Sequence, residues 1–562
     1  MINSDHHKDE KILASNPTPT SHSQKPQKGN GSSVRLANSP ELVKALRVCI
    51  RAYGVGYVFA TAPKLIKTIL GFLLSPRKST PKGQNPIVAF LIAIATVIKD
   101  GTSSRKDGMS MLLLISLGGY KLLELFLNRG MKKAILAQQL QRQNEQQHSH
   151  QQQWTRNDAD KIELPPELRQ RITMMASFLS SAAAIIFMHR YRPHHATIDY
   201  SLFAVVRGLD VLGHIAVKNR WGPRWLGSYG SLAVFVMACT EIMFSWLYEP
   251  ERLPGPYAFW ITKMARMDKR LLGALRGVRL GAIKYGQPNT PEARNMLISL
   301  CRDLHLDPKM GDIDVINKVP CLVVHQNVSH SCEVHAGYRW IQGFLVSSGI
   351  YLPVHLLPAV INPKAFLKKL KEDPVGTTIS TLLSAARSSA FLASYIALTW
   401  YGICFWRSRI MPLASRLRGK EISGDIIDNI YGSLLGSFLC GFSVQIEKPH
   451  RRAEMALYVL PRAMYSMWSR IMFGRLSRKT EIAGETLMFA TSMCVLLTGM
   501  MWGQDMVRPS MRGLLGWMLE IPRKRQQRHG KGKAKADDPE PSAVAAIDDK
   551  GALATVERER SI

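Results

Sequence analysis

Two long apolar stretches, joined by a short polar connector, decide the fold of this chain. Residues 341–361 read IQGFLVSSGIYLPVHLLPAVI, and residues 377–400 read TTISTLLSAARSSAFLASYIALTW. A helix of about 20 residues crosses a hydrocarbon core of roughly 30 Å, so each stretch is long enough to span a membrane. Arg387 is the only Lys, Arg, Asp or Glu in either stretch. The pair predicts two membrane-spanning helices, one of which carries a charge in its interior.

Further apolar segments lie on both sides of this pair. They occupy residues 40–74, 86–98, 109–127, 173–188, 198–216, 229–247, 431–444, 455–472 and 483–502. The segment at 40–74 contains several basic residues and is either a span or an interfacial amphipathic helix, and 86–98 is short for a span. The sequence therefore predicts an all-α, polytopic integral membrane protein with about eight to eleven apolar segments.

The chain is strongly basic, with 74 Lys and Arg against 42 Asp and Glu and a net charge of +32. The basic residues lie between the apolar segments and in the tails rather than on one soluble face, which argues against nucleic acid as a partner. Their placement is typical of loops that contact the anionic headgroups of a lipid bilayer. Residues 263–284, where basic and apolar residues alternate, are predicted to form a basic amphipathic helix on an anionic leaflet.

Composition divides the chain into membrane and polar segments. A disordered tail (1–38) precedes N-terminal membrane or interfacial segments (40–127), a Gln-rich polar linker (128–172) and a first membrane half that includes the basic segment (173–287). A Cys/His-containing loop (288–340), a second membrane half (341–519) and a basic, then disordered, C-terminal tail (520–562) follow. The linker is either a solvated loop or an extension of the preceding helix.

A short motif occurs once in each predicted membrane half. Residues 244–250 read FSWLYEP and residues 442–449 read FSVQIEKP, and each motif ends a segment rich in Gly and Ser. Each of those segments follows one with an arginine in its middle, Arg207 in the first half and Arg387 in the second. Small residues let membrane helices approach closely. The order and composition predict two weakly related halves, an arrangement common in transport folds but also found in inert scaffolds.

Candidate metal ligands gather immediately before the first of the two long stretches. Thiolate and imidazole groups suit zinc, and a closed tetrahedral site needs four of them. The sequence offers Cys321, His325, His330, Cys332 and His335. The spacing is not that of a zinc finger, so a structural zinc site, a Cys321–Cys332 disulfide and ordinary loop residues stay open as interpretations. A catalytic metal would also need an open position and an acid or base, for which Glu333 is available.

Charged residues inside the apolar segments are the second candidate constellation, because such residues are costly in a membrane and mark pathways or interior pairs. Arg207 and Asp210 lie on one helix face and are predicted to pair. Arg387 has no nearby acid, so its partner is expected on another helix, with Glu241 and Glu485 as candidates. The set of intramembrane charges is Arg207, Asp210, Glu241, Arg387 and Arg462. It indicates either substrate or headgroup binding, or structural salt bridges between helices.

Nucleotide-binding and hydrolase signatures are missing from the sequence. It contains no GxxxxGK[ST], GxSxG or HExxH motif and no dinucleotide-binding fingerprint after a strand. We therefore predict that the protein is not an enzyme.

Several motifs around the Cys/His segment resemble one known family. They are PCLVVH at 320–325, SCEVH at 331–335, GFLVSSGIYLPVHLLPA at 343–359 and AARSSAFL at 385–392. These resemble the transmembrane protein 135 family, also called the peroxisomal membrane protein of 52 kDa, with this chain as a fungal-like member. The resemblance covers 320–400 most specifically and the second half more loosely. The Gln-rich linker and basic tail depart from the animal pattern.

The resemblance implies a multi-pass protein of mitochondrial and peroxisomal membranes and a distant kinship to the Tim17/22/23 translocase fold. It also implies a role in organelle dynamics, including fission, and in lipid or sterol handling, together with protein partners on those membranes. No catalytic activity is carried over. The favoured function is therefore non-enzymatic support of lipid trafficking or organelle organisation. The alternatives are a Tim17-like translocase or small-molecule transporter, and a metal-dependent membrane enzyme.

Overall fold

The computed structural model describes residues 40–74, 86–102, 108–145, 162–191, 197–223, 225–472 and 477–521, and every regular element within these ranges is helical. This confirms the all-α class. The described residues belong to one compact unit that ends at Ile521. The predictions for the tail at 1–38, for 146–161 of the Gln-rich linker and for the basic tail after Ile521 lie outside the described residues.

Seven described helical stretches are long and apolar enough to cross a membrane, as a polytopic membrane protein requires. Two further predicted spans have other forms. α18 (Ile430–Gly441) has 12 residues and so a length of about 18 Å, too short for a hydrocarbon core. α19 (Pro449–Met472) is amphipathic and carries several charges. The seven candidate spans are Met109–Arg142, Pro166–Tyr191, Ile198–Lys218, Tyr229–Tyr248, Cys332–Leu357, Pro374–Arg418 and Arg478–Trp502.

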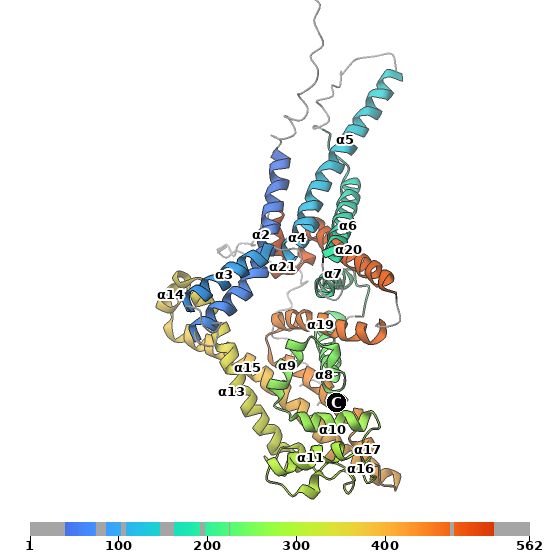
Figure 1. Ribbon diagram of the computed structural model, residues 1–562. Coiled ribbons are helices and arrows are strands. Elements are labelled where there is room, and N and C mark those ends of the chain that lie inside the picture. Colours follow the sequence, from blue (N-terminus) through green and yellow to red (C-terminus); the bar gives the residue numbers. More distant parts are fainter. Residues whose placement is uncertain are drawn as a thin grey trace, which may run out of the picture. The chain divides into compact units, whose positions relative to one another are not determined.

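The N-terminal helices share one apolar core with buried side chains from 176–211 and 489–519. α2 (Pro40–Leu74) contacts α4 (Met109–Leu113), the π-helical turn η1 (Leu114–Gly118) and α5 (Gly119–Glu145). Because α5 continues to Glu145, the first part of the predicted linker is an extension of that helix. α5 in turn lies beside α6 (Pro166–Tyr191), as Figure 1 shows.

Helices of the two predicted halves interleave. α7 (Ile198–Lys218) packs against α19 and α20 (Arg478–Trp502), and α20 also packs against α6. α8 (Trp225–Tyr248) lies between α18 and α19. The longest first-half helices, α6, α7 and α8, therefore have second-half helices as their main neighbours (Figure 1).

The central second-half helices complete this arrangement. α13 (Cys332–Ile361) makes its most extensive contact with α15 (Pro374–Phe405), and α15 also packs on α18. A short helix, α14 (Pro363–Glu372), connects α13 to α15. The two stretches that opened the sequence analysis are thus adjacent antiparallel helices, and α15 continues through η6 (Trp406–Ile410) into α16 (Met411–Arg418).

Small residues allow α15 and α18 to approach closely, as their Gly/Ser composition predicts. A Cβ atom added to Gly402 would lie 2.5 Å from the Cα atom of Gly436. A Cβ on Gly436 would lie 2.4 Å from the carbonyl oxygen of Thr399. Neither contact is sterically tolerable, so only glycine fits at these two positions.

The basic segment at 263–284 is not one surface helix, and that prediction is wrong. It divides into α9 (Gly255–Ala265) and α10 (Lys269–Arg279), separated by a left-handed residue, Arg266, at φ 48°. α10 buries its apolar face in the protein core. Arg276 donates hydrogen bonds of 2.7 and 3.0 Å to the last carbonyls of α8, which lack helical partners. These contacts occupy side chains that were expected to face lipid headgroups.

The predicted loop at 288–340 is a folded connector. It contains α11 (Pro291–Asp303), the 3-10 turn η5 (Pro308–Gly311) and α12 (Cys321–Val324), and its apolar side chains join the core beneath α8. A buried ion pair anchors it, with Arg407 Nε 2.7 Å from Asp428 Oδ1. The second carboxylate oxygen of Asp428 accepts the backbone N–H of Val319 at 3.1 Å. This anchor holds the segment that leads into the Cys/His cluster.

Candidate functional site

Three candidate metal ligands meet at the junction of the connector with α13 and α15. His325, Cys332 and Cys404 are buried, and their ligand atoms all lie within 4.8 Å of one another. His325 Nδ1 donates a hydrogen bond of 2.7 Å to the carbonyl oxygen of Ser329. That bond leaves Nε2 as the free ligand atom, 3.3 Å from Cys404 Sγ. A ring held by a carbonyl in this way is the usual support for a metal-binding histidine.

Cys321 adjoins this group. Its thiol lies within hydrogen-bonding reach of Cys332, and burial raises its pKa. Burial likewise lowers the pKa of His325, which keeps its ring neutral and able to bind a metal. Both cysteines and the histidine come from helix starts or ends: α12 begins at Cys321, directly after Pro320, and α13 begins at Cys332.

The other two predicted ligands lie elsewhere. His330 is exposed. His335 is buried, stacks on the His325 ring at a centroid distance of 4.3 Å and accepts a hydrogen bond of 3.0 Å from Arg339 Nε. Its edge-on contact with Trp400 places it against α15 rather than among the thiols. Of the five predicted residues, the structure thus brings together His325 and Cys332, with Cys321 beside them.

Cys404 completes the cluster and is absent from the predicted ligands. It lies on α15, 79 residues after His325, in an apolar run, where a free cysteine commonly behaves as a small hydrophobic side chain. All eight cysteines are free thiols, so the structure does not contain the alternative Cys321–Cys332 disulfide.

The predicted pair between Arg207 and Asp210 is wrong. Arg207 lies 3.4 Å from Glu454 on α19, and Asp210 accepts hydrogen bonds of 2.8 and 2.9 Å from Arg508. The two residues share a helix face, but charges on other elements reach each of them first. They tie α7 to the C-terminal part of the chain.

Arg387 also differs from its prediction. It is exposed on α15 and has no hydrogen bond or ion pair with any residue that the structure describes. Glu241, one of its expected partners, pairs with Arg470 at 2.9 Å, and Glu485 accepts a hydrogen bond from Ser201 at 2.7 Å. The predicted intramembrane charges therefore do not line one common path.

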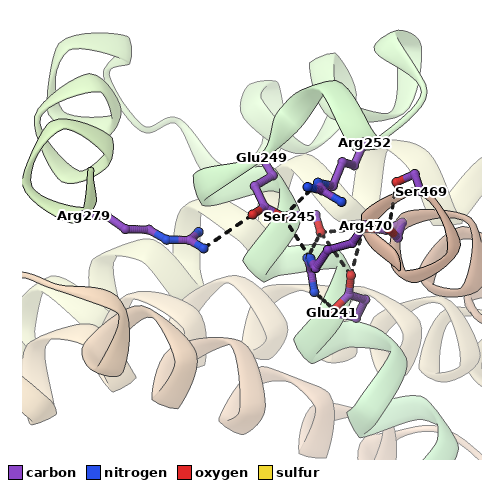
Figure 2. Close-up of polar contacts among 8 residues, drawn as sticks. Glu241, Ser245, Glu249, Arg252, Arg279, Ser469 and Arg470 are labelled. Carbon is purple, nitrogen blue, oxygen red and sulfur yellow. Dashed lines mark hydrogen bonds and ion pairs between the residues drawn. The ribbon is translucent and has the colours of Figure 1, made fainter. Parts of the chain in front are cut away.

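Arg470 is the centre of a polar network between α8 and α19, drawn in Figure 2. Its guanidinium binds Glu241 at 2.9 Å and Glu249 at 3.0 Å, and it donates to Ser245 at 3.1 Å. Glu249 has further ion pairs with Arg252 at 3.0 Å and Arg279 at 3.4 Å. Arg462, the fifth predicted charge, pairs with Asp199 at 2.6 Å. These contacts hold α19 against the first half.

A cavity of about 1050 Å³ lies among α8, α9, α13, α15 and α19. Most of its wall is apolar or aromatic, and no local sequence pattern predicts it because its wall is built from five separate helices. The aromatic lining residues are Phe235, Trp246, Tyr257, Trp260, Tyr351, Phe391, Tyr395, Trp400 and Tyr458.

One region of the cavity wall is polar. Glu447, on the 3-10 turn η7 (Phe442–Ile446) at its C-terminal cap, is only 3% exposed and accepts a short hydrogen bond from the Ser388 hydroxyl. His355 Nε2 lies 3.3 Å from the same Ser388 oxygen. Since the Ser388 hydrogen is used on Glu447, His355 is the donor in that contact. Arg451 lies 3.9 Å from the Glu447 carboxylate, and the Arg452 guanidinium donates to the backbone carbonyl of Glu447 at 2.8 Å.

No protein-family model, curated protein or solved structure matches this chain, so its resemblance to the transmembrane protein 135 family rests on the quoted motifs alone.

Proposed function

We propose that this is a non-enzymatic membrane protein that holds an amphipathic lipid in the cavity and thereby supports lipid or sterol trafficking in mitochondrial or peroxisomal membranes. The cavity carries this proposal. Its volume of about 1050 Å³ is at the upper end of the range for small-molecule sites, which is roughly 300–1,000 Å³. The organelle and the link to its organisation and fission come from the family resemblance, as do protein partners on those membranes.

The distribution of polarity in the cavity supports a lipid rather than a water-soluble substrate. Apolar and aromatic side chains cover most of the wall, while the polar groups are gathered around Glu447 and around the Asp199–Arg462 pair. A lipid presents the same division between an apolar body and a polar end. Exposed apolar side chains of α13, such as Val354 at the cavity wall, also give lipid a route to it from a bilayer.

Photo-crosslinking of the purified full chain in nanodiscs tests this function. A photoactivatable sterol and a photoactivatable phospholipid should label peptides of α13, α15 and α19 that line the cavity. Leu392→Trp, which places a larger ring at the cavity wall, should reduce that labelling. The matched control is Leu345→Trp on the exposed face of α13. Equal labelling in all three proteins would remove the cavity as the lipid site.

The transporter or Tim17-like translocase receives less support from the charged residues. Arg207, Asp210 and Glu241 are each engaged in ion pairs with separate elements, and Arg387 is exposed away from them. A conducting path lined by these four residues predicts that Arg387→Ala stops flux in proteoliposomes while the fold survives. The lipid-binding proposal predicts that this variant leaves lipid labelling unchanged.

The Cys/His cluster is proposed to hold zinc in a structural role. The donor set fits this metal, because the thiolates of Cys332 and Cys404 and the His325 imidazole supply three ligands, and the Cys321 thiolate would close the tetrahedral shell. His325, Cys332 and Cys404 would hold the ion, with Cys321 as the fourth ligand. Bound zinc would supply no acid–base chemistry there, since a closed shell leaves no position for water, and this argues against the metal-dependent enzyme.

Metal analysis of the detergent-purified protein tests the zinc proposal. We expect about one zinc per chain in the wild type, its loss in Cys332→Ser/Cys404→Ser, and its retention in Cys494→Ser, whose thiol is outside the cluster. No zinc in the wild type, or equal zinc in the double variant, would contradict it.

A further inference from the structure

The two copies of the repeated motif end in glutamates with very different surroundings. Glu249 ends FSWLYE in the first half, and Glu447 ends FSVQIE in the second. Three arginines surround the first carboxylate within 3.4 Å. The second has a single arginine, Arg451, at 3.9 Å, and its other partners are the Ser388 hydroxyl and the Lys448 backbone N–H.

Glu447 is also the more deeply buried of the two. Its side chain is 3% exposed against 18% for Glu249. A buried carboxylate is costly unless a partner neutralises it, and a guanidinium at 3.9 Å that is itself 38% exposed neutralises it poorly. The nearby Arg452 guanidinium donates to the carbonyl oxygens of Glu447 and Gln445 rather than to the carboxylate. Among the described residues, the Glu447 carboxylate therefore lacks the close arginine contacts that Glu249 has.

The remaining charges of the cavity do not fill this role. Arg462 is bound to Asp199 at 2.6 Å, and Glu454, a further acid of the wall, is engaged by Arg207 at 3.4 Å. Asp199 and Glu454 are thus each paired with an arginine, which leaves Glu447 as the acid of the wall with the longest ion-pair distance.

Aromatic rings line the same cavity as this carboxylate, among them Tyr351 of α13 and Tyr458 of α19. The faces of aromatic rings attract cations such as an ammonium group. The Ser388 hydroxyl donates to Oε1 of Glu447, while Oε2 has the Lys448 backbone N–H at 3.4 Å and Arg451 at 3.9 Å, so Oε2 is the oxygen that a ligand would approach.

We infer that the cavity takes an amphiphile whose polar end is an ammonium group, and that Glu447 binds this group while Tyr351 and Tyr458 line its surroundings. The inference rests on the proposed lipid-binding function and names the class of ligand. The ammonium supplies the positive charge that Arg470, Arg252 and Arg279 supply to Glu249 in the first half. The apolar chain of the ligand occupies the wall formed by α8, α9 and α15.

Binding of three amphiphiles that share one chain, hexadecylamine, hexadecanol and palmitate, tests the inference on the full chain in detergent at neutral pH. Each competes against radiolabelled hexadecylamine. The amine should bind about tenfold more tightly than the alcohol, because a charged hydrogen bond contributes more than a neutral one, and palmitate should bind least. Glu447→Gln should lower amine affinity by about tenfold and leave alcohol affinity unchanged.

Two further variants keep the result interpretable. Glu249→Gln changes the matching residue outside the cavity and should preserve the preference for the amine. Ser388→Ala removes the hydroxyl that donates to Glu447 but keeps the carboxylate, so it should also preserve the preference for the amine. It provides a second measurement at this site in case Glu447→Gln does not fold. Equal binding of amine and palmitate, or an unchanged preference in folded Glu447→Gln, overturns the inference but leaves lipid binding intact. Binding of none of the three amphiphiles overturns the lipid-binding function itself.

Discussion

Similar short motifs lie at the ends of α8 and α18, but different side chains surround the glutamate in each motif. At the end of α8, arginines from η4 (Pro250–Arg252), α10 and α19 converge on Glu249. Beyond the end of α18, Ser388 of α15 donates to Glu447 and His355 of α13 contacts Ser388, while the ion-pair partner Arg451 is 3.9 Å away. The comparison teaches that a repeated motif fixes where an acid lies, while the helices packed around it decide whether that acid is structural or available.

Substitution of Arg470 should lower the stability of the protein more than any other change proposed here. Arg470→Ala leaves Glu241 and Glu249 without their shared partner, and we expect a loss of about 3 kcal/mol in unfolding free energy, since removing one member of a poorly solvated pair costs roughly 3–5 kcal/mol. Thermal unfolding in detergent measures it. Arg470→Lys should recover only part of the loss, because lysine cannot bridge two carboxylates in a planar fork. An unchanged midpoint would contradict a structural role.

Neutralising the two glutamates separately should sharpen the comparison. Glu249→Gln leaves three arginines facing a neutral amide and should cost about 2 kcal/mol. Glu447→Gln removes a poorly compensated buried charge and should cost less than about 1 kcal/mol, or stabilise the ligand-free protein. Unfolding free energies of both variants in the same detergent test this prediction. A larger loss of stability for Glu447→Gln than for Glu249→Gln would show that Glu447, and not Glu249, is the structural acid.

Arg451 should contribute little to stability. It is 38% exposed and 3.9 Å from Glu447, and pairs of this kind contribute about 0–1 kcal/mol. Arg451→Ala should therefore shift the unfolding free energy by no more than about 0.5 kcal/mol. A loss as large as that of Arg470→Ala would show that Glu447 is already compensated within the chain.

The exposed ion pair of Arg294 with Asp312, in the connector at 288–340, is a reference for the carboxylates at the two motif ends. The Arg294 hydrogen bonds, at 2.8 and 2.6 Å, hold the pKa of Asp312 below its usual range. The carboxylate thus stabilises the fold above its unfolded pKa of about 3.9, and this contribution is lost as pH falls through the folded value. Because amide exchange itself slows as pH falls, the quantity to compare is the protection factor. Protection factors near Asp312 should fall slightly in acid, and Arg294→Ala should already show the lower protection at neutral pH.

Local sequence patterns predicted the long apolar helices but not all of the contacts that their side chains make. The apolar runs at 341–361 and 377–400 predicted α13 and α15, because this signal lies within each segment. The Gly/Ser content predicted a close helix approach, and the structure places it at Gly402 and Gly436. The basic run at 263–284 was misinterpreted since composition does not reveal that the guanidinium of Arg276 caps α8.

The candidate sites bring together residues that are far apart in the sequence, and a local pattern does not indicate such contacts. His325 and Cys332 are close in sequence and were predicted together, but Cys404 reaches them only because α15 packs along α13. The partners of Arg207 and Asp210 come from α19 and from the segment after α20 for the same reason. The cavity requires five helices and therefore had no signal in any one of them.

Because helices of the two halves interleave, α8 is synthesised well before the second-half helix that it packs against. Glu241 precedes its partner Arg470 by 229 residues, and ribosomes add about 5–20 residues per second, so α8 waits on the order of tens of seconds for α19. Throughout that interval its two acids have no arginine from the second half. We therefore expect chains that stall before α19 to leave Glu241 without Arg470 and to be digested by protease sooner than the full chain.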